Sequence, residues 1–212
     1  MDNNEPDIKI SKIILFGDSV LFGIGASQRN YGCGRILREL LKNTHIIILG
    51  GRNRNTTRDG LQRLHDDILK YTEPAYVIIL FGNNDCRLKG IDEPMVSLFE
   101  YKENLKKMIK EIKTNAKIPI LSNLQPIDSS MVYKTLPDMR KLIVNIDSPR
   151  EWHDKYNLIC NQLATEECIK LADINSVLNR YGHNVIAGDG LHPNDFGHKI
   201  IAQEFLKAIK DC

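Results

Sequence analysis

The sequence has little that would direct the protein to a membrane or a nucleic acid. No apolar run approaches the roughly 18 residues of a membrane span. The 29 basic and 27 acidic side chains give a net charge of +2 and are scattered along the chain. This balance predicts neither a nucleic-acid partner nor an anionic membrane surface. Residues 1–7 are polar and acidic, unlike a secretory leader, so we expect a cytoplasmic protein.

The usual motifs for metals and cofactors are also missing. The five cysteines are odd in number, widely spaced and without a Cys-x-x-Cys pair, which argues against a disulfide framework or a structural zinc site. The chain has no complete dinucleotide glycine fingerprint, no P-loop and no Gly-x-Ser-x-Gly turn. We therefore expect free thiols, no metal and no cofactor.

What the chain does contain is an alternation of short apolar runs and amphipathic stretches. With 212 residues, 42% of them hydrophobic, it is expected to form a single domain, 1–212. The runs predict strands at 10–16, 45–49, 75–81, 118–121 and 170–174. Periodic spacing predicts helices at 31–42, 58–71, 97–114, 151–168 and 195–210. This order predicts an α/β fold with a mostly parallel sheet between two helical layers.

Two segments fall outside this alternation. We expect residues 1–9 to be flexible. Residues 125–150 contain three prolines and exceed an ordinary connection. They are expected to form a partly helical insertion near the active site.

Four polar clusters follow predicted strands or precede the last helix, at 17–20, 50–57, 82–85 and 189–194. Ligands of a parallel sheet bind beyond the carboxyl ends of its strands, where such loops meet. Each cluster alone is ordinary turn chemistry. In the last cluster, Asp189 lies three residues before His192 and can orient its imidazole, leaving the other ring nitrogen free to accept a proton from Ser19.

Together the clusters resemble the four sequence blocks of the SGNH/GDSL hydrolase superfamily, and the likeness spans nearly the whole chain. The resemblance implies a flavodoxin-like fold with a central five-stranded sheet. It also implies a serine esterase or acylhydrolase in which Ser19 is the nucleophile, His192 the base and Asp189 the residue that orients the imidazole.

The resemblance further implies an oxyanion hole made by the Ser19 N–H, a backbone N–H of the second block and the Asn84 side chain. Aligning that block places Arg54 where the family has glycine, and Gly51 is the nearest glycine. We expect Arg54 to be the donor, with Gly51 in a reshaped loop as the alternative. Asp18, Gly51 and Asn83 are expected to contact substrate.

The substrate itself is less constrained by the sequence. We expect the pocket wall to come from 83–93 and from the 125–150 insertion. No long apolar lid is visible, which favours a short acyl ester and a carbohydrate acetylesterase. A lysophospholipase-like or thioesterase-like acylhydrolase is the alternative, followed by a catalytically silent binding protein on the same fold. The partner is a small-molecule acyl ester, and the sequence indicates no oligomeric state.

Overall fold

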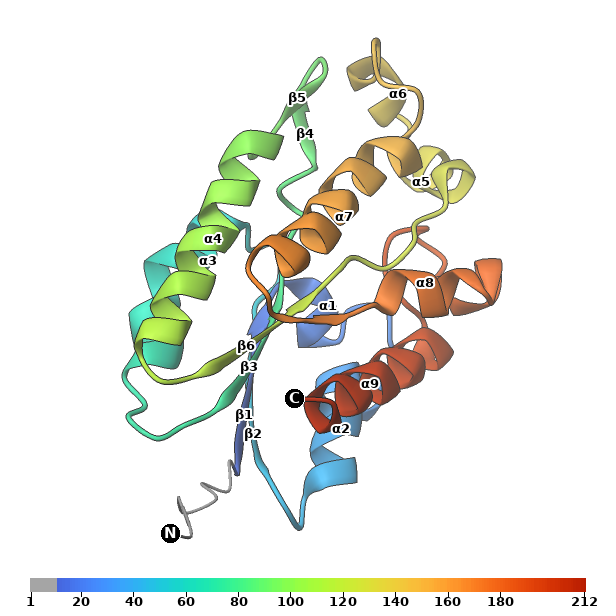
Figure 1. Ribbon diagram of the computed structural model, residues 1–212. Helices are drawn as coiled ribbons and strands as arrows, with labels where there is room; N and C mark the ends of the chain where they lie inside the picture. The colour runs from blue at the N-terminus through green and yellow to red at the C-terminus, as the bar shows by residue number, and fades with distance from the viewer. Residues whose placement is uncertain (1–10) are drawn as a thin grey trace, which may run out of the picture.

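A computed structural model describes residues 11–212, and a five-stranded sheet lies at its centre (Figure 1). All neighbouring strands in this sheet are parallel, in the order β2-β1-β3-β6-β7. The strands are β1 (Lys12–Gly17), β2 (Ile46–Gly51), β3 (Tyr76–Leu80), β6 (Ile118–Ser122) and β7 (Lys170–Ala172). The short β4 (Leu88–Gly90) and β5 (Glu93–Pro94) form a separate antiparallel hairpin.

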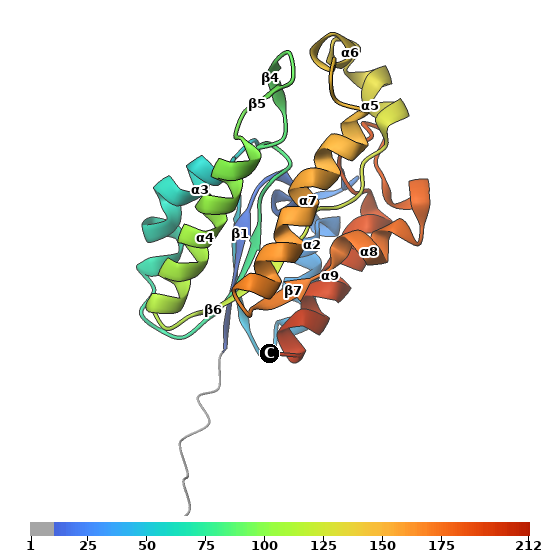
Figure 2. The ribbon, with the colours of Figure 1, turned by 45° about the horizontal axis from the view of Figure 1, so that its top comes forward.

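Helices cover both faces of the sheet (Figure 2). On one side lie α2 (Cys33–Leu41), α8 (Ile174–Asn179) and α9 (Asp195–Lys210). On the other lie α3 (Thr57–Leu64), α4 (Leu98–Thr114) and α7 (Pro149–Glu166). The shorter helices α1 (Ser19–Phe22), α5 (Ser129–Thr135) and α6 (Met139–Leu142) lie near the carboxyl edge of the sheet. The predicted three-layer α/β architecture is confirmed.

The central strands are apolar along their whole length because helices bury them from both sides. Ile13, Ile14, Leu15 and Phe16 of β1 are fully buried. The sheet order changes direction at β1, whose neighbours are β2 and β3. In a parallel sheet this is the point where a crevice opens beyond the strand ends.

The predicted strands and long helices form close to their expected bounds, and two local features differ. The helix expected over 58–71 is α-helical only for Thr57–Leu64 and continues as a π-helical turn over His65–Leu69. The β4–β5 hairpin was not predicted. The insertion at 125–150 is partly helical as expected, since it holds α5 and α6. The expectation for residues 1–9 lies outside the described residues.

His198 of α9 links three elements of the fold from a fully buried position. Its Nδ1 accepts the Cys33 N–H at the start of α2, and its Nε2 lies 2.9 Å from the Ile24 carbonyl oxygen, to which it donates. The first bond requires a neutral imidazole, because a protonated ring has no nitrogen that can accept. Burial lowers the pKa of His198 to about 4, outweighing the hydrogen bond to Ile24.

A pH dependence of stability follows from His198. Between its usual pKa of 6.5 and the folded value of about 4, the unfolded state binds the additional proton, so folding weakens as the pH falls. As the pH falls through this interval, we expect the free energy of unfolding of the wild type to decrease by about 3 kcal/mol more than that of His198→Gln. Urea unfolding of both proteins at several pH values measures the difference. If the free energy of unfolding changed equally with pH in the two proteins, His198 would not be neutral in the folded state.

Candidate active site

Ser19 lies just beyond the end of β1, as the first residue of α1. The chain turns there because Gly17 lets β1 pass close to β3. A Cβ at Gly17 would lie 2.1 Å from the Leu80 carbonyl oxygen, which no side chain tolerates. The Asp18 N–H donates to the same carbonyl at 3.1 Å. The turn therefore fixes the Ser19 side chain beyond the carboxyl edge of the sheet.

Asp18 supports this turn from inside the protein. Its side chain is fully buried, accepts the Val20 N–H at 2.9 Å, and accepts the Asn83 side-chain amide at 2.9 Å. Burial raises the pKa of Asp18 to about 6, against the lowering effect of these hydrogen bonds. The expectation that Asp18 contacts substrate is corrected: its carboxylate is enclosed and caps the helix that carries Ser19.

Ser19, His192 and Asp189 form a continuous chain of hydrogen bonds. Ser19 Oγ lies 3.0 Å from His192 Nε2, and His192 Nδ1 lies 2.6 Å from Asp189 Oδ2. The other Asp189 oxygen accepts the backbone N–H groups of Leu191 and His192. This local turn holds the carboxylate against the imidazole of a residue only three positions away. The imidazole is thereby oriented to accept the hydroxyl proton of Ser19.

The electrostatics of Asp189 suit this arrangement. Partial burial raises its pKa, but hydrogen bonds from the His192 side chain and from the His192 and Leu191 N–H groups outweigh that effect, and the pKa is lowered to about 2. The carboxylate therefore stays ionised near neutral pH and favours the imidazolium that forms when His192 takes a proton.

Arg54 and Asn84 lie at the same cavity as Ser19. Arg54 has a φ of 65°, in the left-handed region that favours glycine. Within the described chain, no group accepts its backbone N–H. Asn84 Nδ2 donates to the Asn55 carbonyl at 3.0 Å, which fixes its side chain. Gly51 ends β2 and lines a different cavity, so the expectation that it contacts this substrate site is corrected.

Arg63 of α3 was missed in the sequence because an arginine on an amphipathic helix is usually exposed. It is only 7% exposed, and its guanidinium stacks on Phe16 with the carbon 4.4 Å from the ring centroid. The guanidinium donates to the carbonyls of Gly17 and Gly50. It also donates to the Asn55 side chain at 2.8 Å. One buried cation thus joins the loops that carry Ser19, Arg54 and, through Asn55, Asn84.

A second polar network lies behind Asn83. Gln125 Nε2 and His153 Nε2 both donate to Asn83 Oδ1, at 2.8 and 2.9 Å. Gln125 also donates to the Leu191 carbonyl beside His192. Asn83 therefore connects the Asp18 turn with the His192 loop, and it lines the cavity as well. Gln125 and His153 carry no motif signal and were not identified from the sequence.

The cavity at Ser19 has a volume of about 390 Å³. As predicted, 83–93 and 125–150 supply most of its wall, and both segments project beyond the carboxyl edge of the sheet (Figure 1). The insertion is more apolar at this point than expected, with four side chains from α5, α6 and their flanks: Val132, Leu136, Met139 and Ile143. They line the same cavity as the amides of Asn83, Asn84 and Gln125.

Two other observations bear on cofactors and membranes. Among residues 11–212, no group of three or more His, Cys, Asp and Glu side chains is placed to hold a metal ion. In the same part of the chain, no helix has the length and apolar character to cross a bilayer. All five cysteines are free.

Known proteins resemble this chain in sequence. A model of the GDSL-like lipase/acylhydrolase family matches residues 15–200. The chain belongs to that family. Its members include a GDSL esterase/lipase of Arabidopsis thaliana that is 28% identical over 95% of this chain and 79% of the relative. An acetylxylan esterase of Geobacillus stearothermophilus is 28% identical over 77% of this chain and 71% of the relative.

Solved structures share the fold. The lipase/acylhydrolase of Enterococcus faecalis superposes with a TM-score of 0.74 at 22% identity, covering 95% of this chain and 96% of that one. The acetylxylan esterase Axe2 of Geobacillus stearothermophilus gives the same TM-score at 24% identity, again covering 95% and 96%. This GDSL family member is accordingly a hydrolase that acts on ester bonds, and its substrates are small-molecule esters.

The left-handed conformation of Arg54 makes its backbone role testable. Arg54→Gly keeps the N–H and relieves the positive φ, so we expect kcat for a small neutral ester within about twofold of the wild type. Arg54→Val keeps the N–H but disfavours this backbone conformation, and kcat should fall by about 10-fold or more as the donor shifts. Steady-state kinetics with phenyl acetate compares them. An equal loss in both variants would assign the role to the guanidinium instead.

Proposed function

We propose that the protein is a serine esterase that removes short acyl groups, acetyl above all, from carbohydrate esters through an acyl-enzyme. The observation that carries this proposal is the Ser19–His192–Asp189 hydrogen-bond chain at the cavity wall. A hydroxyl, an imidazole and a carboxylate, hydrogen-bonded in this order, are the groups that acyl transfer requires.

In the proposed mechanism, Ser19 Oγ attacks the ester carbonyl carbon while His192 Nε2 takes the hydroxyl proton. The developing oxyanion accepts hydrogen bonds from the N–H groups of Ser19 and Arg54 and from Asn84 Nδ2. His192 then gives its proton to the leaving alcohol, and an acyl-Ser19 ester remains. Water, deprotonated by His192, attacks that ester, and collapse of the second tetrahedral intermediate releases the acid and restores Ser19.

The polar part of the cavity supports a carbohydrate as the alcohol half of the ester. Asn83 and Asn84 line the cavity near Ser19 and are partly exposed, and amide groups suit the hydroxyls of a sugar. The acetylxylan esterase relative acts on an acetylated carbohydrate by its name. A volume of about 390 Å³ fits a short acyl group together with one sugar ring.

A longer acyl chain is the second candidate, and one observation favours it. Val132, Leu136, Met139 and Ile143 give the cavity an apolar wall, which could hold an acyl chain as in a lysophospholipase-like or thioesterase-like acylhydrolase. A short-acyl esterase and a long-chain acylhydrolase differ in how their rates depend on the length of the acyl group. The chain-length preference therefore separates the two candidates.

The catalytic assignment predicts the behaviour of two variants. Ser19→Ala and His192→Ala should each lower kcat by about 10⁴-fold or more, and Ser19→Ala/His192→Ala should be little worse than either, because the two groups act as a unit. Kinetics with p-nitrophenyl acetate measures this, with circular dichroism as the control for folding. Additive losses in the double variant would contradict a shared proton-transfer step.

The substrate proposal predicts a chain-length profile. The value of kcat/KM for p-nitrophenyl esters should be highest for the acetate or butyrate and should decrease by the octanoate, because the cavity is small. Acetylated xylooligosaccharides should release acetate with the wild type and not with Ser19→Ala. A value that rises steadily beyond the octanoate would favour the acylhydrolase candidate and overturn the acetylesterase.

A further inference from the structure

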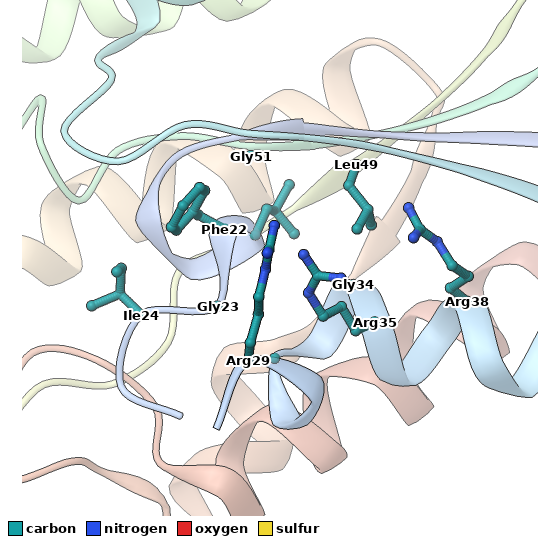
Figure 3. A pocket seen from close by; sticks show the side chains of 11 residues that line it. Phe22, Gly23, Ile24, Arg29, Gly34, Arg35, Arg38, Leu49 and Gly51 are labelled. Atoms are coloured by element: carbon teal, nitrogen blue, oxygen red, sulfur yellow. The ribbon is translucent and has the colours of Figure 1, made fainter. Parts of the chain in front are cut away.

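A second cavity, of about 640 Å³, lies between α1, the start of α2 and the end of β2. Figure 3 shows the side chains that surround it. Four glycines contribute to its lining: Gly23, Gly32, Gly34 and Gly51. Part of its surface is therefore backbone. Gly51 also lets the end of β2 pack closely against α1, since a Cβ there would lie 2.3 Å from the Phe22 nitrogen.

Three arginines supply all the charge in this lining: Arg29, Arg35 and Arg38. Within residues 11–212, none of the three forms a salt bridge; Arg38 makes one hydrogen bond, 3.4 Å long, to the Ile47 carbonyl. Arg52 and Arg63, in contrast, are both paired with Asp67. The cavity thus concentrates positive charge that the described fold does not neutralise.

The three guanidinium groups interact unfavourably with one another. Arg35 and Arg38 are three residues apart on α2 and share one face of the helix, and Arg29 rises beside Arg35 (Figure 3). Burial lowers the pKa of Arg35, and repulsion from Arg29 and Arg38 lowers it further. An anion bound among the three would remove this repulsion.

We propose that this cavity binds a small molecule through a phosphate or diphosphate group. Guanidinium groups match phosphate oxygens with paired, charge-assisted hydrogen bonds, and three of them suit a multiply charged ligand. Phe22, which is 56% exposed, lies at the same cavity with Ile24 and Leu49. These side chains offer an apolar surface to the remainder of the ligand.

The phosphate has two possible sources, because Ile24 lines both this cavity and the one at Ser19. It belongs either to a free phosphorylated molecule or to a phosphate substituent on the ester substrate. The chemistry of recognition is the same in both cases, and the experiment below separates them.

The test is isothermal titration calorimetry with pyrophosphate at about 0.15 M salt, where exposed charges more than one Debye length apart are largely screened. We expect one site per chain in the wild type. Arg35→Gln and Arg38→Gln should each weaken binding by about tenfold or more, because each removes charge-assisted hydrogen bonds. Arg180→Gln is the matched control, since Arg180 is exposed and outside the cavity. This variant should bind pyrophosphate with the affinity of the wild type.

Absence of binding to the wild type at millimolar pyrophosphate would overturn the proposal. So would an equal loss of affinity in Arg180→Gln, since binding would then follow net charge alone. The source is identified by KM for phenyl acetate and for a phenyl acetate that carries a phosphonate. If pyrophosphate raises KM only for the phosphonate ester, the group belongs to the substrate. If bound pyrophosphate leaves the ratio of KM for phenyl acetate to KM for the phosphonate ester unchanged, the ligand is a free molecule.

Discussion

The buried guanidinium of Arg63 is the interaction on which the candidate active site depends. It lies over the ring of Phe16 of β1 and near that of Phe81 after β3. It donates to the Gly17 and Gly50 carbonyls and to the Asn55 side chain. Gly17 and Gly50 lie at the ends of two adjacent strands, and Asn55 directly follows Arg54 in the next loop. A charge in such a place is costly unless every donor finds a partner. These contacts hold the two strand ends and the loop together, and Ser19, Arg54 and Asn84 line one cavity.

The opposite side of the site is supported by neutral polar groups. Asn83 lies at the junction, since it donates to Asp18 and accepts from Gln125 and His153. Burial lowers the pKa of His153 to about 4, so its imidazole stays neutral and keeps its N–H directed at Asn83. The loop that carries His192 is joined to this network through the Leu191 carbonyl. Ser19 and His192 are distant in sequence, and the fold brings them together through partners that perform no chemistry.

Much of the fold was predictable because strands that are buried on both faces have uninterrupted apolar sequences. The strand ends were predictable too, and with them the meeting of the Ser19, Asn84 and His192 loops. Arg63, Gln125 and His153 were not, because their burial depends on contacts with residues far away in the sequence. Asp18 was misplaced for the same reason: a carboxylate beside a nucleophile suggests a ligand, and its enclosure follows only from the approach of β1 to β3.

The central claim is that Ser19 is a nucleophile activated by His192. Reaction with a fluorophosphonate, followed by mass spectrometry of the intact protein and of its peptides, tests it without any assumption about substrate. A fluorophosphonate traps an activated serine hydroxyl as a stable covalent adduct. The account predicts one adduct per chain, on the peptide that contains Ser19, and none in Ser19→Ala or, on the same timescale, in His192→Ala. An unmodified wild type, or an adduct that persists in Ser19→Ala, would contradict it.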